Sequence, residues 1–174
     1  MESLATFDID LKNLKEDVTL FRFKLDDDFF KSIHGTEVEN GKLEAVLKVT
    51  KAGSEFALDF QADGDVTVTC DRCLEPMQQP VSTTGRLTAR FGTEYAEDGD
   101  AVVVPFETGS LNVAWHFYEF IALAIPVRHV HADGECNAEM LDNLRKWMVE
   151  DGQRQTQTDP RWKDLEKLKT IIKD

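Results

Sequence analysis

Apolar and polar residues alternate along most of the first two thirds of the chain, and this period of two predicts β-strands. Leu43, Ala45, Leu47 and Val49 fall on one face of an extended segment, with charged or polar residues largely on the other. Similar runs cover 18–26, 56–60, 66–70, 77–92 and 101–107. The turn dipeptides Asn40-Gly41, Ala52-Gly53 and Asp63-Gly64 separate the central runs. In segment 18–26 the pattern sets Val18 and Leu20 against Thr19, Arg22 and Lys24.

The last third of the chain changes to helical spacing. Segment 111–125 is apolar nearly all round and ends before Pro126, which predicts a largely buried helix with Ser110 or Asn112 near its N-cap. Segment 137–151 is amphipathic and closes at Gly152. A third helix is expected from Asp159, because Pro160 suits the first helical position. Strands followed by about three helices indicate an α+β fold with a mainly antiparallel sheet.

The length of 174 residues suits one domain with a short appendage. We expect a single α+β domain over 1–152, followed by a polar linker and C-terminal helix over 153–174. Segment 26–33 begins with three aspartates and predicts a short helix or turn. No run of 18 apolar residues occurs, and the N-terminus is acidic where a signal peptide is basic. We therefore expect a cytoplasmic protein with no membrane partner.

The formal net charge of −13 disfavours direct binding to a phosphate backbone. A basic protein is the more natural partner. Segment 160–174 is the main local exception, since it carries five basic and three acidic residues. Its expected partner-binding residues are Arg161, Trp162, Lys163, Lys167 and Lys169.

A C-x-x-C turn, Cys70 to Cys73, follows an alternating strand directly and has the form of a zinc knuckle. Cys136 offers a third thiolate, and His131 is the natural fourth ligand, with His129 as its alternative. Zinc is the only cofactor that these residues predict. Two other interpretations are open at this point: reduced thiols packed at a strand end, or a redox pair. The redox pair is disfavoured, because such motifs normally begin a helix within a βαβ unit.

The remaining candidates for chemistry are weaker. His116 could be a ligand, but it lies on the helix expected to be buried. Glu119 could act as a general acid on the same helix, although a polar helix edge explains it more simply. The chain contains no phosphate-binding loop, dinucleotide-binding loop, nucleophile elbow or H-E-x-x-H motif.

Three stretches taken in order, VTCDRCLEP, NVAWHFYEFIALAIPVRHVH and DPRWKDLEKL, resemble the YceD family of large ribosomal RNA subunit accumulation proteins. The resemblance covers roughly residues 10–172. It matches the family's paired cysteines to Cys70 and Cys73, its helix glutamate to Glu119 and its later cysteine to Cys136. Some relatives carry further cysteines near the C-terminus, whereas this chain has none after Cys136. A four-cysteine site is thereby excluded.

The resemblance implies a non-enzymatic role in large-subunit biogenesis, through accumulation or processing of large-subunit ribosomal RNA. Combined with the charge, it implies a basic ribosomal or assembly protein as partner, with ribosomal RNA contacted directly or indirectly. The alternative is a zinc-stabilised interaction module that has no connection with ribosomes.

Overall fold

The computed structural model describes residues 4–147, and they form two sheets and three α-helices. The larger sheet has the strand order β2-β3-β4-β5-β7-β6, and all neighbours are antiparallel except β5 and β7. The bounds are β2 (Val18–Leu25), β3 (Asn40–Ala52), β4 (Glu55–Thr69), β5 (Pro76–Gly92), β6 (Ala96–Asp98) and β7 (Ala101–Pro105). The smaller sheet pairs β1 (Asp8–Asp10) with β8 (Ser110–Asn112). A 3₁₀ turn, Ala5–Phe7, precedes β1.

The helices are α1 (Asp27–Ile33), α2 (Ala114–Ala124) and α3 (Ala138–Trp147). The predicted α+β class with a mainly antiparallel sheet is therefore confirmed. Asp26 caps α1, because its side chain accepts a hydrogen bond from the Phe29 backbone N–H at 3.2 Å. The third helix expected from the sequence, beginning at Asp159, lies outside the described residues.

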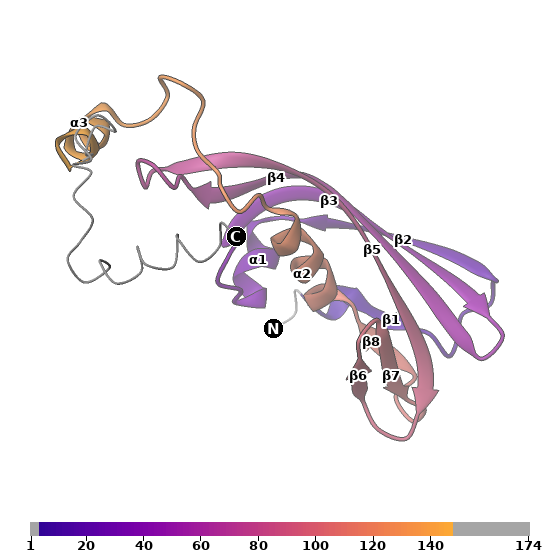
Figure 1. The fold of residues 1–174 in the computed structure, drawn as a ribbon. Helices are drawn as coiled ribbons and strands as arrows, with labels where there is room; N and C mark the ends of the chain where they lie inside the picture. The colour runs from indigo at the N-terminus through magenta and orange to yellow at the C-terminus, as the bar shows by residue number, and fades with distance from the viewer. Residues whose placement is uncertain (1–3, 148–174) are drawn as a thin grey trace, which may run out of the picture. The chain divides into compact units, whose positions relative to one another are not determined.

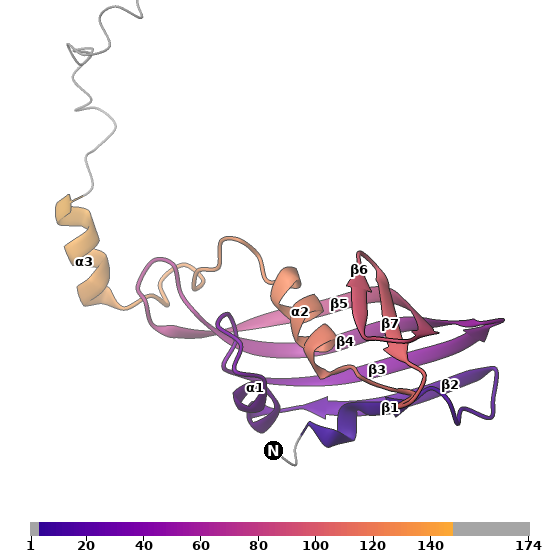
Figure 2. The same cartoon turned by 90° about the horizontal axis from the view of Figure 1, so that it is seen from below.

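One face of the large sheet carries the hydrophobic core, and α1 and α2 lie over that face (Figures 1 and 2). The register places Leu47 opposite Phe60 and Leu58 opposite Leu87, all of them buried. Phe117 of α2 packs edge-on against Phe60, with ring centroids 5.0 Å apart. The alternation of apolar residues thus positions the sheet under α2, whose C-terminal end leads to the candidate site.

The sequence-based prediction was wrong about the inward face of β2. Phe21 and Phe23 pack against the core, whereas Val18 and Leu20 are 44% and 53% exposed. Val18 and Leu20 share their face with Arg22 and Lys24, whereas Phe21, Phe23 and Leu25 form an apolar run on the other face, so the alternation over the whole strand does select the inward face. The two phenylalanines bury more area, and Phe23 stacks on Phe7 with centroids 4.7 Å apart.

Helix α2 begins later than the sequence predicts. Residues 110–112 form β8, and the Asn112 side chain accepts a hydrogen bond from the Ala114 backbone N–H at 3.1 Å. The helix ends as predicted before Pro126, because Ile125 is extended, as a residue preceding proline usually is. Gly85 of β5 allows close packing here, since a Cβ atom at this position would lie 2.4 Å from the Phe120 ring.

Contacts divide the chain into two compact units, residues 1–136 and 137–174. The described part of the second unit is α3 with Asn137, whose side chain accepts a hydrogen bond from the Met140 backbone N–H at 3.1 Å. The boundary predicted at residue 152 lies outside the described residues and stays a prediction. No helix between residues 4 and 147 is long and apolar enough to cross a membrane.

Candidate metal centre

The turn between β4 and β5 holds the first two cysteines in place through its own backbone. The Cys70 N–H donates to the Glu75 carbonyl at 2.9 Å, and the Leu74 N–H donates to the Cys70 carbonyl at 2.9 Å. The Arg72 N–H lies 3.4 Å from the Cys70 sulfur. Both thiols are buried. The C-x-x-C spacing therefore forms a compact knuckle with its sulfur atoms directed inward.

The segment after α2 is attached to this turn by a reciprocal pair of hydrogen bonds. The Asp71 N–H donates to the His129 carbonyl at 2.9 Å, and the His129 N–H donates to the Asp71 carboxylate at 2.8 Å. The His129 ring lies 3.7 Å from the same carboxylate through Nε2, and its Nδ1 lies 3.0 Å from the Pro126 carbonyl. Two stretches almost sixty residues apart in sequence are thus fixed side by side.

Beyond this contact the fold brings together Cys70, Cys73, His131 and Cys136, whose ligand atoms all lie within 4.8 Å of one another. The Cys70 and Cys136 sulfurs are 3.9 Å apart, and the Cys73 sulfur is 3.3 Å from His131 Nδ1. Zinc–sulfur bonds of about 2.3 Å in a tetrahedron place two sulfurs about 3.8 Å apart. The donor set of three thiols and one imidazole, at this spacing, fits a zinc ion.

The electrostatics of the cluster favour a thiolate even without metal. Burial raises the pKa of Cys70, but the N–H groups of Cys73, His131 and Arg72 outweigh it and lower that pKa to about 5. The Cys70 sulfur raises the pKa of His131, against the opposing effect of burial. Burial raises the pKa of Cys136. Within the cluster Cys70 is therefore best prepared to meet a cation, whereas Cys136 would have to release a proton to bind one.

The sequence named two further histidines and one glutamate. His129 lies next to the cluster but outside it, with its ring against Asp71. His116 is buried on α2 against Phe60, and burial lowers its pKa. Glu119 is exposed on the same helix. The expected partner-binding residues lie outside the described part of the chain: Arg161, Trp162, Lys163, Lys167 and Lys169.

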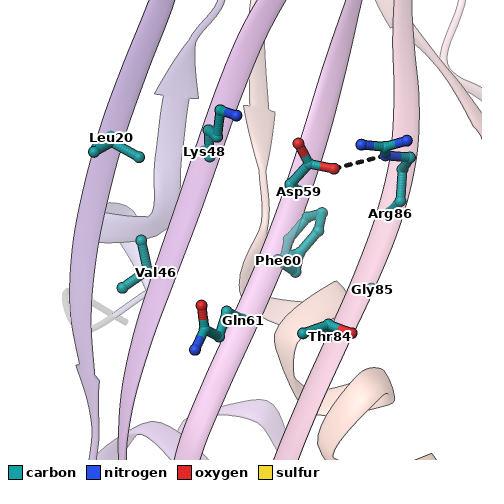
Figure 3. Close-up of a pocket in the computed structure, with 9 residues that line it drawn as sticks. All are labelled: Leu20, Val46, Lys48, Asp59, Phe60, Gln61, Thr84, Gly85 and Arg86. Carbon is teal, nitrogen blue, oxygen red and sulfur yellow. Dashed lines mark hydrogen bonds and ion pairs between the residues drawn. The ribbon is translucent and has the colours of Figure 1, made fainter.

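A separate hollow of about 630 Å³ lies on the large sheet, lined by residues of β2, β3, β4 and β5 that Figure 3 labels. Asp59 and Arg86 point toward each other there, and their ion pair measures 2.6 Å. The neighbouring Phe60 packs on α2, so Asp59, one residue earlier, faces away from the helices. This carboxylate is already paired with a cation, and the hollow gives no indication of a reaction.

Comparison with known proteins adds the family. A family model described as large ribosomal RNA subunit accumulation protein YceD matches residues 58–169, which is more than half of the chain. The chain belongs to the YceD family. This YceD protein matches no curated protein and no solved structure. The family region begins within β4 and includes all four residues of the cluster.

Two residues that matter at this site were not expected from the sequence of the YceD protein. Asp71 connects the turn to the segment after α2, and its position inside the C-x-x-C motif was the available signal. Leu74 adopts a left-handed backbone conformation with φ of 61°. No local sequence signal marks it, because leucine is not a residue typical of that conformation.

Proposed function

We propose that this YceD protein is a non-enzymatic factor in large ribosomal subunit biogenesis. It supports the accumulation or processing of large-subunit ribosomal RNA by contacts with proteins and, secondarily, with RNA. Membership of the YceD family is the observation that carries this proposal. The family name gives the process, and the contacts within it are the proposed part.

The proposed cofactor is one structural zinc ion, held by Cys70, Cys73, His131 and Cys136. All four donors are supplied by the protein, and a closed site of that kind stabilises a fold, whereas catalytic zinc keeps a position open. The four residues connect the β4–β5 turn to the segment that follows α2. Metal binding would therefore stabilise a part of the protein outside the hydrophobic core cluster, because none of the four residues belongs to that cluster.

The proposed direct partner is a basic ribosomal or assembly protein. The chain carries a net charge of −13, so its field attracts a basic protein and repels free ribosomal RNA. Arg161, Trp162, Lys163, Lys167 and Lys169 are the proposed contact residues in the C-terminal segment. Arg161, Lys163, Lys167 and Lys169 are opposite in charge to the rest of the chain, so these four are the residues proposed for any direct contact with RNA.

Co-sedimentation with large-subunit precursors tests the proposal. Purified YceD protein is mixed with precursor particles isolated from a strain that lacks it, and the gradient is run at low and at high salt. The proposal expects co-migration with the precursors at low salt and release at high salt, together with a loss of large-subunit RNA in that strain. Normal RNA levels without any co-migration would favour the second candidate, a zinc-stabilised interaction module unrelated to ribosomes. The cysteine and histidine cluster alone is compatible with that candidate as well.

A further inference from the structure

Leu74 has an unusual backbone for its residue type. Its φ of 61° lies in the left-handed region, which disfavours residues that carry a Cβ atom. Among residues 4–147, His34 is the other residue besides glycine with a positive φ, and it ends α1, where that conformation is common. Glycine or asparagine would fit the Leu74 position with less strain.

Burial does not explain the leucine either, because its side chain is 65% exposed. Leu74 thus combines an apolar side chain exposed to solvent with a backbone conformation that disfavours leucine. The turn keeps it there, since the Leu74 N–H donates to the Cys70 carbonyl at 2.9 Å. Neither the local conformation nor the core benefits from leucine, which points to a use at the surface.

Leu74 lies on the lining of a pocket of about 260 Å³ that Cys70 also lines. Val68 and Ile125 are further apolar residues of the lining, Glu37 is an acidic one, and Asp71 lies there together with His129, whose N–H donates to its carboxylate. The volume is smaller than the roughly 300–1,000 Å³ of pockets that enclose whole small molecules. It suits one or two side chains of a protein segment.

We propose that Leu74 and this pocket form a docking site for a basic, partly apolar segment of a large-subunit protein. An apolar side chain of that segment packs on Leu74 and Ile125, and a lysine or arginine beside it faces Glu37. The net charge of −13 and the acidic Glu37 on the lining disfavour the phosphates of RNA as occupant. This inference rests on the proposed function and names the surface that it uses.

The neighbouring cluster would make this contact efficient. Leu74 follows Cys73 directly, so a metal-bound knuckle fixes its position before any partner arrives. A preorganised apolar side chain loses little conformational entropy on binding, and this increases the affinity of the contact. The strained backbone is then retained for binding and not for stability.

The test compares Leu74→Asn with wild type in the full-length, zinc-loaded protein. Asparagine accepts the left-handed backbone, so zinc content should be unchanged and the thermal midpoint equal or higher. Affinity for purified large-subunit precursors should fall at least tenfold. Leu20→Asn is the matched control, because Leu20 is similarly exposed on β2 and should bind within twofold of wild type. Glu37→Gln should weaken binding at low salt and have little effect at high salt.

The occupant is identified by placing the photo-cross-linker p-benzoylphenylalanine at position 74. A cross-link to a basic large-subunit protein supports the proposal, whereas a cross-link to ribosomal RNA or to a second copy of the chain overturns it. Wild-type protein that does not bind precursors would overturn the proposed function and this site with it. Wild-type binding that Leu74→Asn leaves intact would overturn the docking site alone. Loss of zinc or a lower midpoint in Leu74→Asn would assign Leu74 a structural role instead.

Discussion

Replacing Cys136 by serine should remove the stabilisation that zinc provides while leaving the core in place. Serine is nearly isosteric with cysteine, and Cys136 is the last residue of the first compact unit and no member of the hydrophobic core cluster. Its sulfur is 3.9 Å from that of Cys70 and 4.0 Å from His131 Nδ1, so the change removes one corner of the ligand set. A serine hydroxyl is a poor zinc ligand at neutral pH, because the ligand must be deprotonated.

The size of the effect follows from linkage between binding and folding. Zinc at a thousand times its dissociation constant stabilises the folded state by about 4 kcal/mol. For a chain of this length each kcal/mol moves the thermal midpoint by about 2–4 °C, so zinc should raise it by about 8–16 °C. The same difference should separate wild type from Cys136→Ser in zinc-containing buffer.

The assay is thermal unfolding followed by circular dichroism, with zinc and with a chelator, alongside native mass spectrometry. Wild type in chelator should match Cys136→Ser in either buffer, and of these samples zinc-loaded wild type alone should show one bound ion. His131→Asn should behave like Cys136→Ser, whereas His129→Asn should keep its zinc, which separates the two histidines. Identical midpoints for all samples, with no bound metal, would refute the reasoning and leave the cluster as packed thiols.

Three further results are expected. Gly85→Leu should destabilise the fold by about 1–3 kcal/mol in urea, because its side chain collides with Phe120, and adding Phe120→Ala should recover part of the loss. In metal-free protein the Cys70 thiol should titrate near pH 5, which ultraviolet absorbance detects and Cys70→Ser abolishes. Folding lowers this pKa from 9.0, so the thiolate stabilises the folded state fully above pH 9.0, and this stabilisation disappears as the pH falls through 5. A chain that ends at residue 152 should keep its β-sheet but bind precursors less well, and an unfolded dichroism spectrum would place the missing segment in the core.

Much of the fold could be predicted from the sequence because its strands are long and alternate regularly. Residues 43–49 show the pattern and form the middle of β3 as expected. The prediction failed at Val18 and Leu20 because it rested on the first residues of the strand; their face continues with Arg22 and Lys24, and Phe23 on the other face stacks on Phe7. The parallel pairing of β5 with β7 was not predictable, since it depends on the path of the chain through β6.

The candidate site likewise has features that local sequence predicts and features that depend on long-range contacts. Its ligand types could be listed from C-x-x-C spacing and nearby histidines, whereas the choice of His131 over His129 depends on Asp71, which pairs with the His129 ring. The left-handed backbone at Leu74 had no signal at all, because it follows from the geometry of the whole turn. Residue types and their spacing indicate which residues could bind a metal, and long-range contacts determine which of them lie together.

The separation of the ligands along the chain has a consequence for the order of events during synthesis. Cys70 and Cys136 are 66 residues apart, and β5, β7, β8 and α2 all lie between them. Closing so long a loop is slow unless the intervening elements are already docked. A nascent chain can therefore complete the four-ligand set only after its sheet and α2 have assembled. Metal binding would then follow the assembly of the sheet and α2, so that any surface held by the cluster becomes competent for binding at the last step of folding.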